Sequence, residues 1–342
     1  MEIRLGFIGF GTVGRGFMEL LVQKRADLER EHGFRFRVVA VHDVAFGTVY
    51  DDKGLDGLEL LNKVDRENTF RGHPRYVENA AAEQVILEMG ADTIVEVTPT
   101  NIETGQPAIR YIETALRNKK HVVTTNKGPV ALAYASLREL AEKNGVQFRF
   151  EGTVMSGTPV FHLCETGLAG AKILRIRGIL NGTTNYILTQ MEAGIPYADA
   201  LKDAQEKGYA ETVPDADVKG WDAKAKVLIL ANVLMNAGLR PEEVSCRGIT
   251  EISLEDVKAA RAENRRWKLV GQIERKDNRV LARVEPVALP ADDFLAGISG
   301  VNNALVFETD ALGAVTIIGP GAGRKETGFS VLTDLLAIHR SS

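Results

Sequence analysis

A glycine-rich turn near the start of the chain constrains the fold more than any other feature. Residues 3–8, IRLGFI, form an apolar segment that predicts a buried strand, and GFGTVG follows it directly. The helical pattern RGFMELLVQKRADLERE comes next, so strand, glycine turn and helix stand in the order of a dinucleotide-binding βαβ unit. We expect this turn to bind a pyrophosphate through Gly9, Gly11 and Gly14, and through the first helical residues Thr12 and Val13.

The rest of the first 150 residues alternates between strand and helix patterns. The candidates follow one another in the order RFRVVAVHD, a helical stretch from Ala80 to Glu88, ADTIVEVT, a helical stretch from Pro107 to Asn118, and KKHVVTT. Such alternation predicts parallel strands joined by right-handed crossovers. The sequence therefore predicts an NAD(P)-binding Rossmann domain over residues 1–150.

Polar residues stand where these strands end, and open α/β sheets bind ligands at that edge. Asp43 ends RFRVVAVHD, and we expect it to accept hydrogen bonds from the adenosine ribose; an exposed turn aspartate is the alternative. Thr98 and Pro99 lie where ADTIVEVT would meet the cofactor. Lys127 follows KKHVVTT, which suits a catalytic or ligand-binding lysine as well as a solvated loop lysine.

The second half of the chain has a different pattern. Residues 159–318 contain the strand candidates AKILRIRGIL, RVLARVEPV and ALVFETD to AVTII, with helical segments between the first two. This order predicts an α+β domain with an open, mostly antiparallel sheet. We therefore expect an α/β protein with a second domain over residues 151–319 and a C-terminal helix, within residues 320–342, that packs on the first domain.

Two charged residues stand at the entrance of an apolar helix in DADVKGWDAKAKVLILA, residues 215–231. Asp222 and Lys226 lie four residues apart, so a helix places both on one face. An ordinary ion pair is the simplest interpretation, because this order of acid and base stabilises a helix. A second polar stretch, Asn181 to Thr183 in LNGTTNYIL, follows the strand AKILRIRGIL and predicts a turn that caps the next helix.

Composition and charge exclude several classes of protein. The chain is 44% hydrophobic and 26% charged with a net charge of -4, which suits a globular protein of two domains and argues against nucleic-acid binding. No apolar stretch approaches the roughly 20 residues that cross a bilayer, and the N-terminus lacks a signal-peptide pattern. We expect a cytoplasmic protein that binds no membrane, with Cys164 and Cys246 as small core residues.

Five segments together resemble homoserine dehydrogenases. GFGTVG, TTNKGPVA, LNGTTNYIL, GYAETVPDADVKGWDAKAK and GPGAG occur in the order and at roughly the spacing of that family, over essentially the whole chain. The resemblance implies NAD(P)-linked interconversion of L-homoserine and L-aspartate 4-semialdehyde, on the route to threonine and methionine. It also implies that the second domain binds the substrate, carries the catalytic groups and forms a homodimer through its uncovered sheet.

The resemblance assigns catalytic roles to three residues. The hydroxyl of homoserine must lose a proton as its carbon loses a hydride, so a basic group must lie beside that oxygen. We expect Lys226 to exchange this proton and Asp222 to orient the amine. Lys127 resembles the family's second active-site lysine, and the choice between the two lysines stays open.

Five further residues match the substrate-binding positions of the family. Glu211 and Asp217 correspond to the carboxylates that meet the substrate's amino group, whose charge needs partners once it is buried. Thr183 and Tyr209 supply hydroxyls beside it, and Gly182 belongs to the same turn.

The resemblance also implies ligands near the cofactor end of the site. Gly321 of GPGAG is expected to contact the cofactor. A monovalent cation such as Na⁺ would lie near EGTVMSGT. Its predicted ligands are the carboxylate of Glu151 and the carbonyls of Val154, Ser156 and Thr158.

The residues around Asp43 favour NAD over NADP. A carboxylate repels a 2′-phosphate, and the following VAFGTVY has no Arg or Lys to neutralise one. Lys53 is the first Arg or Lys after Asp43 along the chain and is the nearest candidate for the opposite effect.

Two departures from the family pattern affect loops. Val213 stands before Pro214 where the family usually has Asp, Asn or Ser, and RKETGFS follows GPGAG where many members have a Pro-Thr-Ala-Ser-like stretch. The chain also ends soon after GPGAG, so we expect no threonine-sensing domain and only weak, competitive inhibition by threonine. The alternatives are another NAD(P)-dependent dehydrogenase of an amino-acid alcohol or aldehyde, and a non-catalytic NAD(P)-binding sensor.

Overall fold

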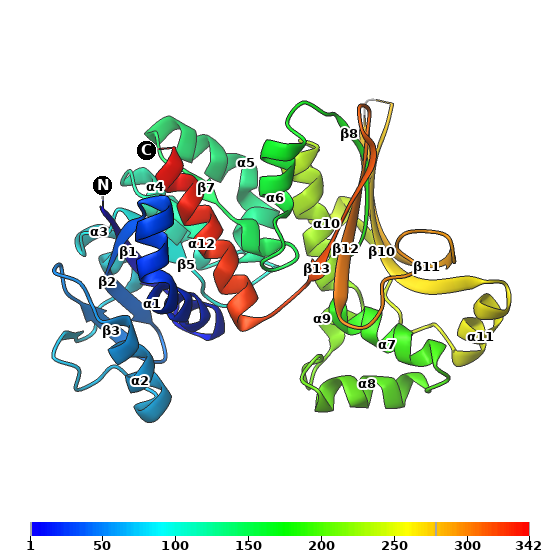
Figure 1. The fold of residues 1–342 in the computed structure, drawn as a ribbon, viewed down its shortest axis with the longest axis horizontal. Helices are drawn as coiled ribbons and strands as arrows, with labels where there is room; N and C mark the ends of the chain where they lie inside the picture. Colours follow the sequence, from blue (N-terminus) through cyan, green and yellow to red (C-terminus); the bar gives the residue numbers. More distant parts are fainter. Residues whose placement is uncertain (1, 278, 342) are drawn as a thin grey trace. The chain divides into compact units, whose positions relative to one another are not determined.

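The computed structural model describes residues 2–277 and 279–341 and divides into two compact units (Figure 1). The first unit contains Met1–Gly157 and Gly323–Ser342, and the second contains Thr158–Ala322. Each unit has its own sheet.

The sheet of the first unit has seven strands in the order β4-β3-β2-β1-β5-β6-β7. The strands β2, β1, β5, β6 and β7 are parallel, and β3 and β4 pair antiparallel at one edge. The bounds are β1 (Glu2–Ile8), β2 (Arg35–Asp43), β3 (Gly47–Tyr50), β4 (Tyr76–Val77), β5 (Thr93–Glu96), β6 (His121–Thr124) and β7 (Phe148–Arg149). The four predicted strands are β1, β2, β5 and β6. The short strands β3, β4 and β7 were not predicted. Tertiary structure sets their pairing: β3 pairs with β2, β4 with β3 and β7 with β6.

Helices cover both faces of this sheet. They are α1 (Thr12–His32), α2 (Gly57–Glu67), α3 (Ala82–Glu88), α4 (Ala108–Arg117), α5 (Lys127–Asn144) and α12 (Arg324–Arg340), with the 3₁₀ turn η1 (Glu151–Thr153). The sequence did not predict α2. Its N-cap Asp56 accepts hydrogen bonds from the N–H groups of Leu58 and Glu59, which satisfies two of the first-turn donors.

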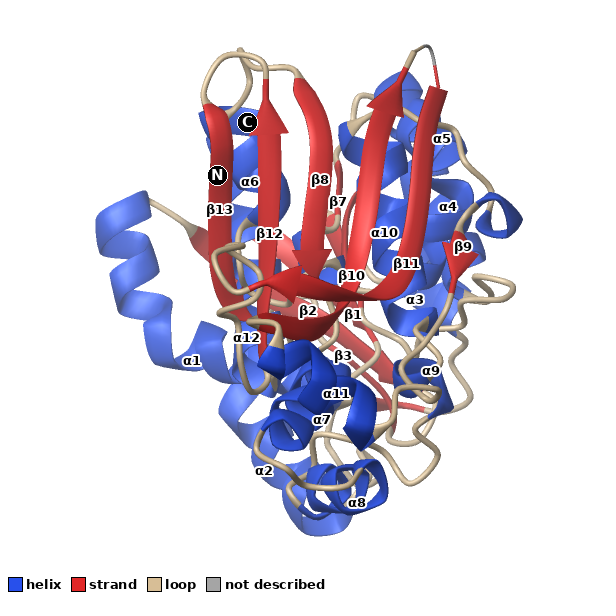
Figure 2. Cartoon of the chain, turned by 90° about the vertical axis from the view of Figure 1, so that its right-hand side faces the viewer, coloured by secondary structure: helices blue, strands red, loops and turns tan. Residues whose placement is uncertain are grey.

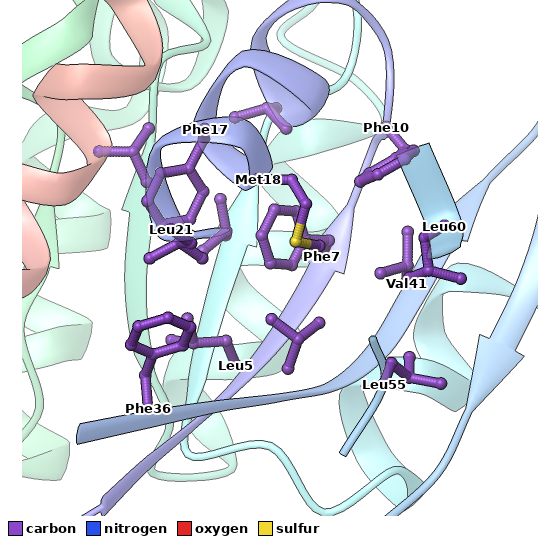
Figure 3. Packing of buried hydrophobic residues seen from close by; sticks show 14 of the residues in the cluster. Leu5, Phe7, Phe10, Phe17, Met18, Leu21, Phe36, Val41, Leu55 and Leu60 are labelled. Atoms are coloured by element: carbon purple, nitrogen blue, oxygen red, sulfur yellow. The ribbon is translucent and has the colours of Figure 1, made fainter. Parts of the chain in front are cut away.

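The core on the α1 side of the sheet is rich in aromatic residues (Figure 3). Phe7 of β1 stacks on Phe17 of α1 with ring centroids 5.4 Å apart, and Phe10 of the glycine turn packs against Phe70 at 5.6 Å. A second cluster, on the side of α3, α4 and α5, is mostly aliphatic. The glycine turn is therefore built on a rigid, fully buried layer.

The C-terminal helix α12 packs closely on α1 within the first unit. A Cβ on Gly16 of α1 would lie 2.3 Å from the carbonyl oxygen of Arg324, and one on Gly328 would lie 2.6 Å from the nitrogen of Phe17. Two glycines thus let the helix backbones approach closely. The side chain of Arg324 forms an ion pair with Glu19.

The sheet of the second unit has six strands in the order β13-β12-β8-β10-β11-β9 (Figure 2). All pairs are antiparallel except β9 with β11. The bounds are β8 (Ile173–Ile179), β9 (Ser245–Cys246), β10 (Arg265–Lys276), β11 (Arg279–Pro290), β12 (Asn302–Thr309) and β13 (Gly313–Pro320). The predicted fold class, a Rossmann-type α/β domain with an α+β domain whose open sheet is mostly antiparallel, is confirmed.

Helix α10 packs on one face of this sheet, since a Cβ on Gly271 of β10 would lie 2.6 Å from Cγ2 of Val227. The helical segments of the unit are α6 (Val160–His162), η2 (Leu163–Gly167), α7 (Gly182–Glu192), α8 (Tyr197–Glu206), α9 (Asp215–Val218), α10 (Trp221–Leu234), η3 (Pro241–Glu243) and α11 (Leu254–Ala262). Among residues 2–277 and 279–341, no helix combines the length and apolar character needed to span a bilayer.

The two cysteines of the second unit differ in burial. Cys164 of η2 is buried, as expected of a small core residue, whereas Cys246 of β9 is only partly buried. The difference follows from position, because β9 is an edge strand of the sheet.

Candidate active site

The second unit brings four of the predicted site residues together around the start of α7. Thr183 belongs to the first turn of that helix, Asp217 to α9, and Asp222 and Lys226 to α10. Gly220 begins α10 with a φ of 82°, a left-handed conformation that separates α9 from α10. This bend lets two short polar segments meet at one point.

Lys226 is almost fully buried, with 7% of its surface exposed. Its Nζ donates to the carbonyl oxygen of Leu180 and to Oδ2 of Asp222, both at 2.6 Å. An ammonium has three N–H donors, so these contacts leave one for a ligand. The predicted pair of Asp222 and Lys226 is present, and both of its side chains are largely buried.

Asn181 links the two carboxylates of the cluster. Its Nδ2 donates to Oδ1 of Asp217 at 2.6 Å and to Oδ2 of Asp222 at 3.0 Å. Its Oδ1 accepts the backbone N–H of Thr184 at 2.9 Å, which is the N-cap bond that the sequence predicted. The link to the carboxylates was not predicted, and its only signal in the sequence is an unusual run of polar residues at the turn.

Asp217 is mostly buried, and burial raises the pKa of its carboxyl. The hydrogen bond from Asn181 and the charge of Lys226 oppose this shift, while the nearby charge of Asp222 adds to it. The two carboxylates and one ammonium leave one net negative charge at the cluster, which is suited to a ligand cation.

The loop after α8 lies beside this cluster and carries Tyr209 and Glu211. Thr183 donates its hydroxyl to the carbonyl oxygen of Tyr209 at 2.5 Å, and the Tyr209 ring packs edge-on against Tyr186 at 5.0 Å. Gln205 donates to the carbonyl oxygen of Glu211 at 3.0 Å, so the loop backbone is held while the Glu211 residue is exposed. Packing requires a glycine at position 182, because a Cβ there would lie 2.7 Å from the carbonyl oxygen of Val301.

The glycine turn of the first unit has the form of a phosphate cradle. A Cβ on Gly9, which has a φ of 101°, would lie 2.6 Å from the carbonyl oxygen of Val97, and one on Gly14 would lie 2.7 Å from that of Gly9. A Cβ on Gly11 would meet no atom within 4 Å. Gly11 is also the N-cap of α1 and provides no side-chain cap for the first N–H groups of the helix, which include those of Thr12 and Val13. These residues fit a dinucleotide.

Asp43 lies at the end of β2, next to this turn. Its carboxylate accepts the N–H of Phe10 at 2.7 Å and that of Ala45 at 2.8 Å, so it fixes the glycine turn whether or not it binds a ribose. Lys53, the first Arg or Lys after Asp43 along the chain, lies far from it in space. Leu55 donates to the carbonyl oxygen of Val38, which places Lys53 roughly 15 Å along β2 from Asp43 at about 3.3 Å per residue.

A buried carboxylate that the sequence did not single out organises the ends of β5 and β6. Glu96 accepts the N–H of Thr98 at 3.0 Å and the hydroxyl of Thr124 at 2.7 Å, and its burial raises the pKa of its carboxyl. Asn126, the N-cap of α5, donates to the carbonyl oxygen of Pro99 at 3.4 Å, and Lys127 is the first residue of that helix. Thr98, Pro99 and Lys127 therefore share one edge of the sheet.

The predicted cation ligands belong to both units. Glu151 is buried in the first unit beside Asp334, with ligand oxygens of the two within 4.8 Å, and its N–H donates to Asp334 Oδ2 at 2.9 Å. In the same unit Val154 is buried, and the hydroxyl of Ser156 bonds that of Thr327. Thr158 belongs to the second unit. The cation stays a prediction.

Packing within the second unit also requires a glycine at position 321. A Cβ there would lie 1.3 Å from Oδ1 of the buried Asn303. Its predicted contact with the cofactor stays a prediction.

Comparison with known proteins adds to this geometry. Residues 159–336 match the homoserine dehydrogenase family model, and residues 9–151 match the model of the homoserine dehydrogenase NAD binding domain. An NAD(+)-dependent homoserine dehydrogenase of Pseudomonas canavaninivorans is 46% identical over 342 residues, covering 100% of this chain and 97% of that protein. The chain belongs to the homoserine dehydrogenase family.

Solved homoserine dehydrogenase structures share the fold over the whole chain. The structure of a putative homoserine dehydrogenase from Archaeoglobus fulgidus has a TM-score of 0.89 and 36% identity, covering 98% of this chain and 99% of that one. A hyperthermophilic archaeal homoserine dehydrogenase in complex with NADPH has a TM-score of 0.85 and 32% identity, covering 100% of this chain and 99% of that one. The resemblance to homoserine dehydrogenases is confirmed. The roles of individual residues stay predictions.

Proposed function

We propose that this protein oxidises L-homoserine to L-aspartate 4-semialdehyde with NAD(P)⁺ and catalyses the reverse reduction. The observation that carries the proposal is the buried Lys226, held by Leu180 and Asp222 with one N–H left for a ligand. The bound nicotinamide would accept or return the hydride. The protein must supply an exchangeable proton and bind the two charged ends of the substrate.

Lys226 is the proposed proton-transfer group. As an amine it would take the proton of the homoserine hydroxyl, and as an ammonium it would donate a proton to the oxygen of the semialdehyde during reduction. Asp222 fixes the direction of Nζ through the 2.6 Å contact between them. Lys127, the first residue of α5, is the proposed second active-site lysine.

Asp217 is the proposed partner of the substrate's ammonium, because it carries the unneutralised charge of the cluster. Glu211, on the adjacent loop, is its proposed second partner, and Thr183 and Tyr209 are proposed to supply hydroxyls. The loop that carries Tyr209 and Glu211 is held through its backbone, so these side chains can turn toward a ligand.

NAD is the proposed preferred cofactor. Asp43 would repel a 2′-phosphate, and Lys53 lies too far along β2 to neutralise one. One relative is named as NAD(+)-dependent and one solved homoserine dehydrogenase is a complex with NADPH, so both cofactors occur in the family. Matched kcat/KM values for the two cofactors would test this choice, and a strong preference for NADP would contradict it.

A homodimer through the second sheet, and a cytoplasmic location, also belong to the proposal. Ile318 of β13 pairs with Ala304 of β12, which pairs with Ile179 of β8, so these side chains share one face. Gly271 of β10 faces α10 and pairs with Gly178 of β8. Ile179 follows Gly178 in β8, so Ile179 and the residues that share its face lie on the side opposite α10. Ile318 is 56% exposed there.

The first experiment incubates the protein with homoserine and NAD and measures the formation of reduced cofactor by its absorbance. Homoserine-dependent reduction is the expected result. Related amino-acid alcohols without the four-carbon chain serve as matched substrates, and a higher kcat/KM for one of them would favour another dehydrogenase of this class. Binding of NADH without turnover of any alcohol would favour a sensor.

A further inference from the structure

The neutral amide of Asn181 joins the two functions of the cluster. We infer that Asn181 is a positioning residue that couples Asp217, the proposed partner of the substrate's ammonium, to the proton-transfer pair of Asp222 and Lys226. The inference rests on the proposed function, because it assigns a role within the same site.

The geometry gives the amide a single orientation. An asparagine has two N–H donors, and in Asn181 they diverge to Asp217 at 2.6 Å and to Asp222 at 3.0 Å. Its oxygen faces the N–H of Thr184 at 2.9 Å. The reversed amide would set its oxygen against both carboxylates and its NH₂ against a donor. Asn181 is 5% exposed, so water has little access to replace these bonds.

The charge of the cluster explains why the linking group is neutral. Asp217 and Asp222 carry two negative charges, and Lys226 carries one positive charge when protonated. A cationic linker would cancel the remaining charge and weaken the attraction for an ammonium ligand. A carboxylate linker would place three like charges together, and one of them would take up a proton. An amide holds both carboxylates and leaves their net charge unchanged.

The link also predicts an effect on pH dependence. Asp217 is faced by Asn181 and Thr183 from α7 and by Asp222 and Lys226 from α10. Hydrogen bonds to a carboxylate favour its charged form, so the donation from Asn181 keeps Asp217 ionised at lower pH. Loss of that donation should raise the pH at which homoserine begins to bind.

Two substitutions separate the link from the helix cap. Asn181→Ser retains an oxygen that can accept the N–H of Thr184 but has no amide donors. Asn181→Asp retains the shape and the cap acceptor, and places an oxygen where the NH₂ group was. Ser253→Ala is the matched control, because it removes the N-cap of α11 in the same unit without changing the proposed site.

The readouts are kcat and KM for homoserine across pH with saturating NAD, the Kd of NADH by fluorescence, and the melting temperature. For both Asn181 variants we expect KM to rise by about tenfold or more, as for loss of a hydrogen bond to a charged group, and the acidic limb of kcat/KM to move to higher pH. The Kd of NADH should stay unchanged. Ser253→Ala should lower the melting temperature and leave the pH profile in place.

A purely structural role gives a different result. An acidic limb at the wild-type pH in both variants, with the loss of activity following the melting temperature, would overturn the inference. If Asn181→Ser does not fold, the closer isostere Asn181→Asp decides the question. Absence of homoserine oxidation in the wild type would remove the proposed function instead, so the two failures are distinguishable.

Discussion

At the residue scale, the cluster of the second unit contains an ion pair, Lys226 with Asp222, that cannot lose one partner alone. Lys226 has two hydrogen-bond acceptors, and Asp217 and Asp222 share the amide of Asn181. Removing one partner of a buried pair leaves the other without compensation, which costs more than the pair contributed. Substitutions here therefore need isosteric replacements and a separate measurement of stability.

Lys226→Met should abolish most of the catalysis while the cofactor still binds. Methionine fills much of the same volume but cannot exchange a proton, so kcat should fall by about 10² or more. The measurement is kcat in both directions, with the Kd of NADH as a control because the proposed cofactor residues of the glycine turn lie in the first unit. A kcat near that of the wild type would contradict this role for Lys226 and would favour Lys127 as the proton-transfer group.

Asp217→Asn should weaken substrate binding and stabilise the fold. Burial raises the folded-state pKa of this carboxyl above its unfolded value, so ionising the buried carboxyl destabilises the fold. This destabilisation is absent below the unfolded pKa, where the carboxyl is protonated in both states. This destabilisation appears as pH rises above the unfolded pKa and is fully present above the folded pKa. We expect a higher melting temperature at pH 7, a smaller gain as the pH falls toward about 4, and a higher KM for homoserine. Equal melting temperatures at neutral pH would show that partners fully compensate the charge.

At the element scale, the starts of four helices supply much of the proposed chemistry. The glycine turn precedes α1, Asn126 precedes α5, Asn181 precedes α7 and Gly220 precedes α10. The first N–H groups of a helix have no partner within the helix, so they bind either a cap or a ligand. Where a capping side chain is present it fixes the turn, and at α1 its absence leaves donors for a phosphate.

Gly11→Ala and Gly14→Ala should therefore have opposite effects. A Cβ on Gly11 meets no atom of the described residues within 4 Å and would enter the space proposed for a phosphate, so the Kd of NADH should rise with little change in melting temperature. A Cβ on Gly14 would collide with the carbonyl oxygen of Gly9, so its substitution should lower the melting temperature first. Thermal denaturation and NADH titration of the two variants, compared side by side, test this. Equal affinity for NADH in Gly11→Ala would place the phosphate elsewhere.

At the scale of the whole molecule, the two faces of the second sheet differ in what covers them. Helix α10 packs on one face, and the opposite face exposes large apolar side chains such as Ile318 and Leu281 among charged ones. Leu281 pairs with Glu274, which pairs with Arg175, and both pairs continue the face that carries Ile318. Part of this face is covered within the chain, because Ile179, Ala304 and Val306 are buried against Leu295 and Ile298, so the proposed interface would lie around Ile318 and Leu281.

Ile318→Lys should convert the proposed dimer into a monomer. An ammonium buried against a second copy would have no partner, so association should weaken while each chain still folds. Sedimentation at micromolar concentration measures the change, and Leu58→Lys on α2 of the first unit is the control for an exposed leucine elsewhere. A wild-type chain that sediments as a monomer would remove the dimer from the proposal.

The sequence by itself determined the fold class, the family, and the strands β1, β2, β5, β6, β8, β11, β12 and β13. These depend on local patterns, namely apolar segments, the glycine turn and short motifs such as LNGTTNYIL. Tertiary structure decided what pairs across long separations. This includes the unpredicted strands β3, β4, β7, β9 and β10, the link from Asn181 to Asp217 and Asp222, and the distance of Lys53 from Asp43. The physical reason is that hydrogen bonds between residues distant in sequence depend on how the elements pack, and no local pattern encodes that packing.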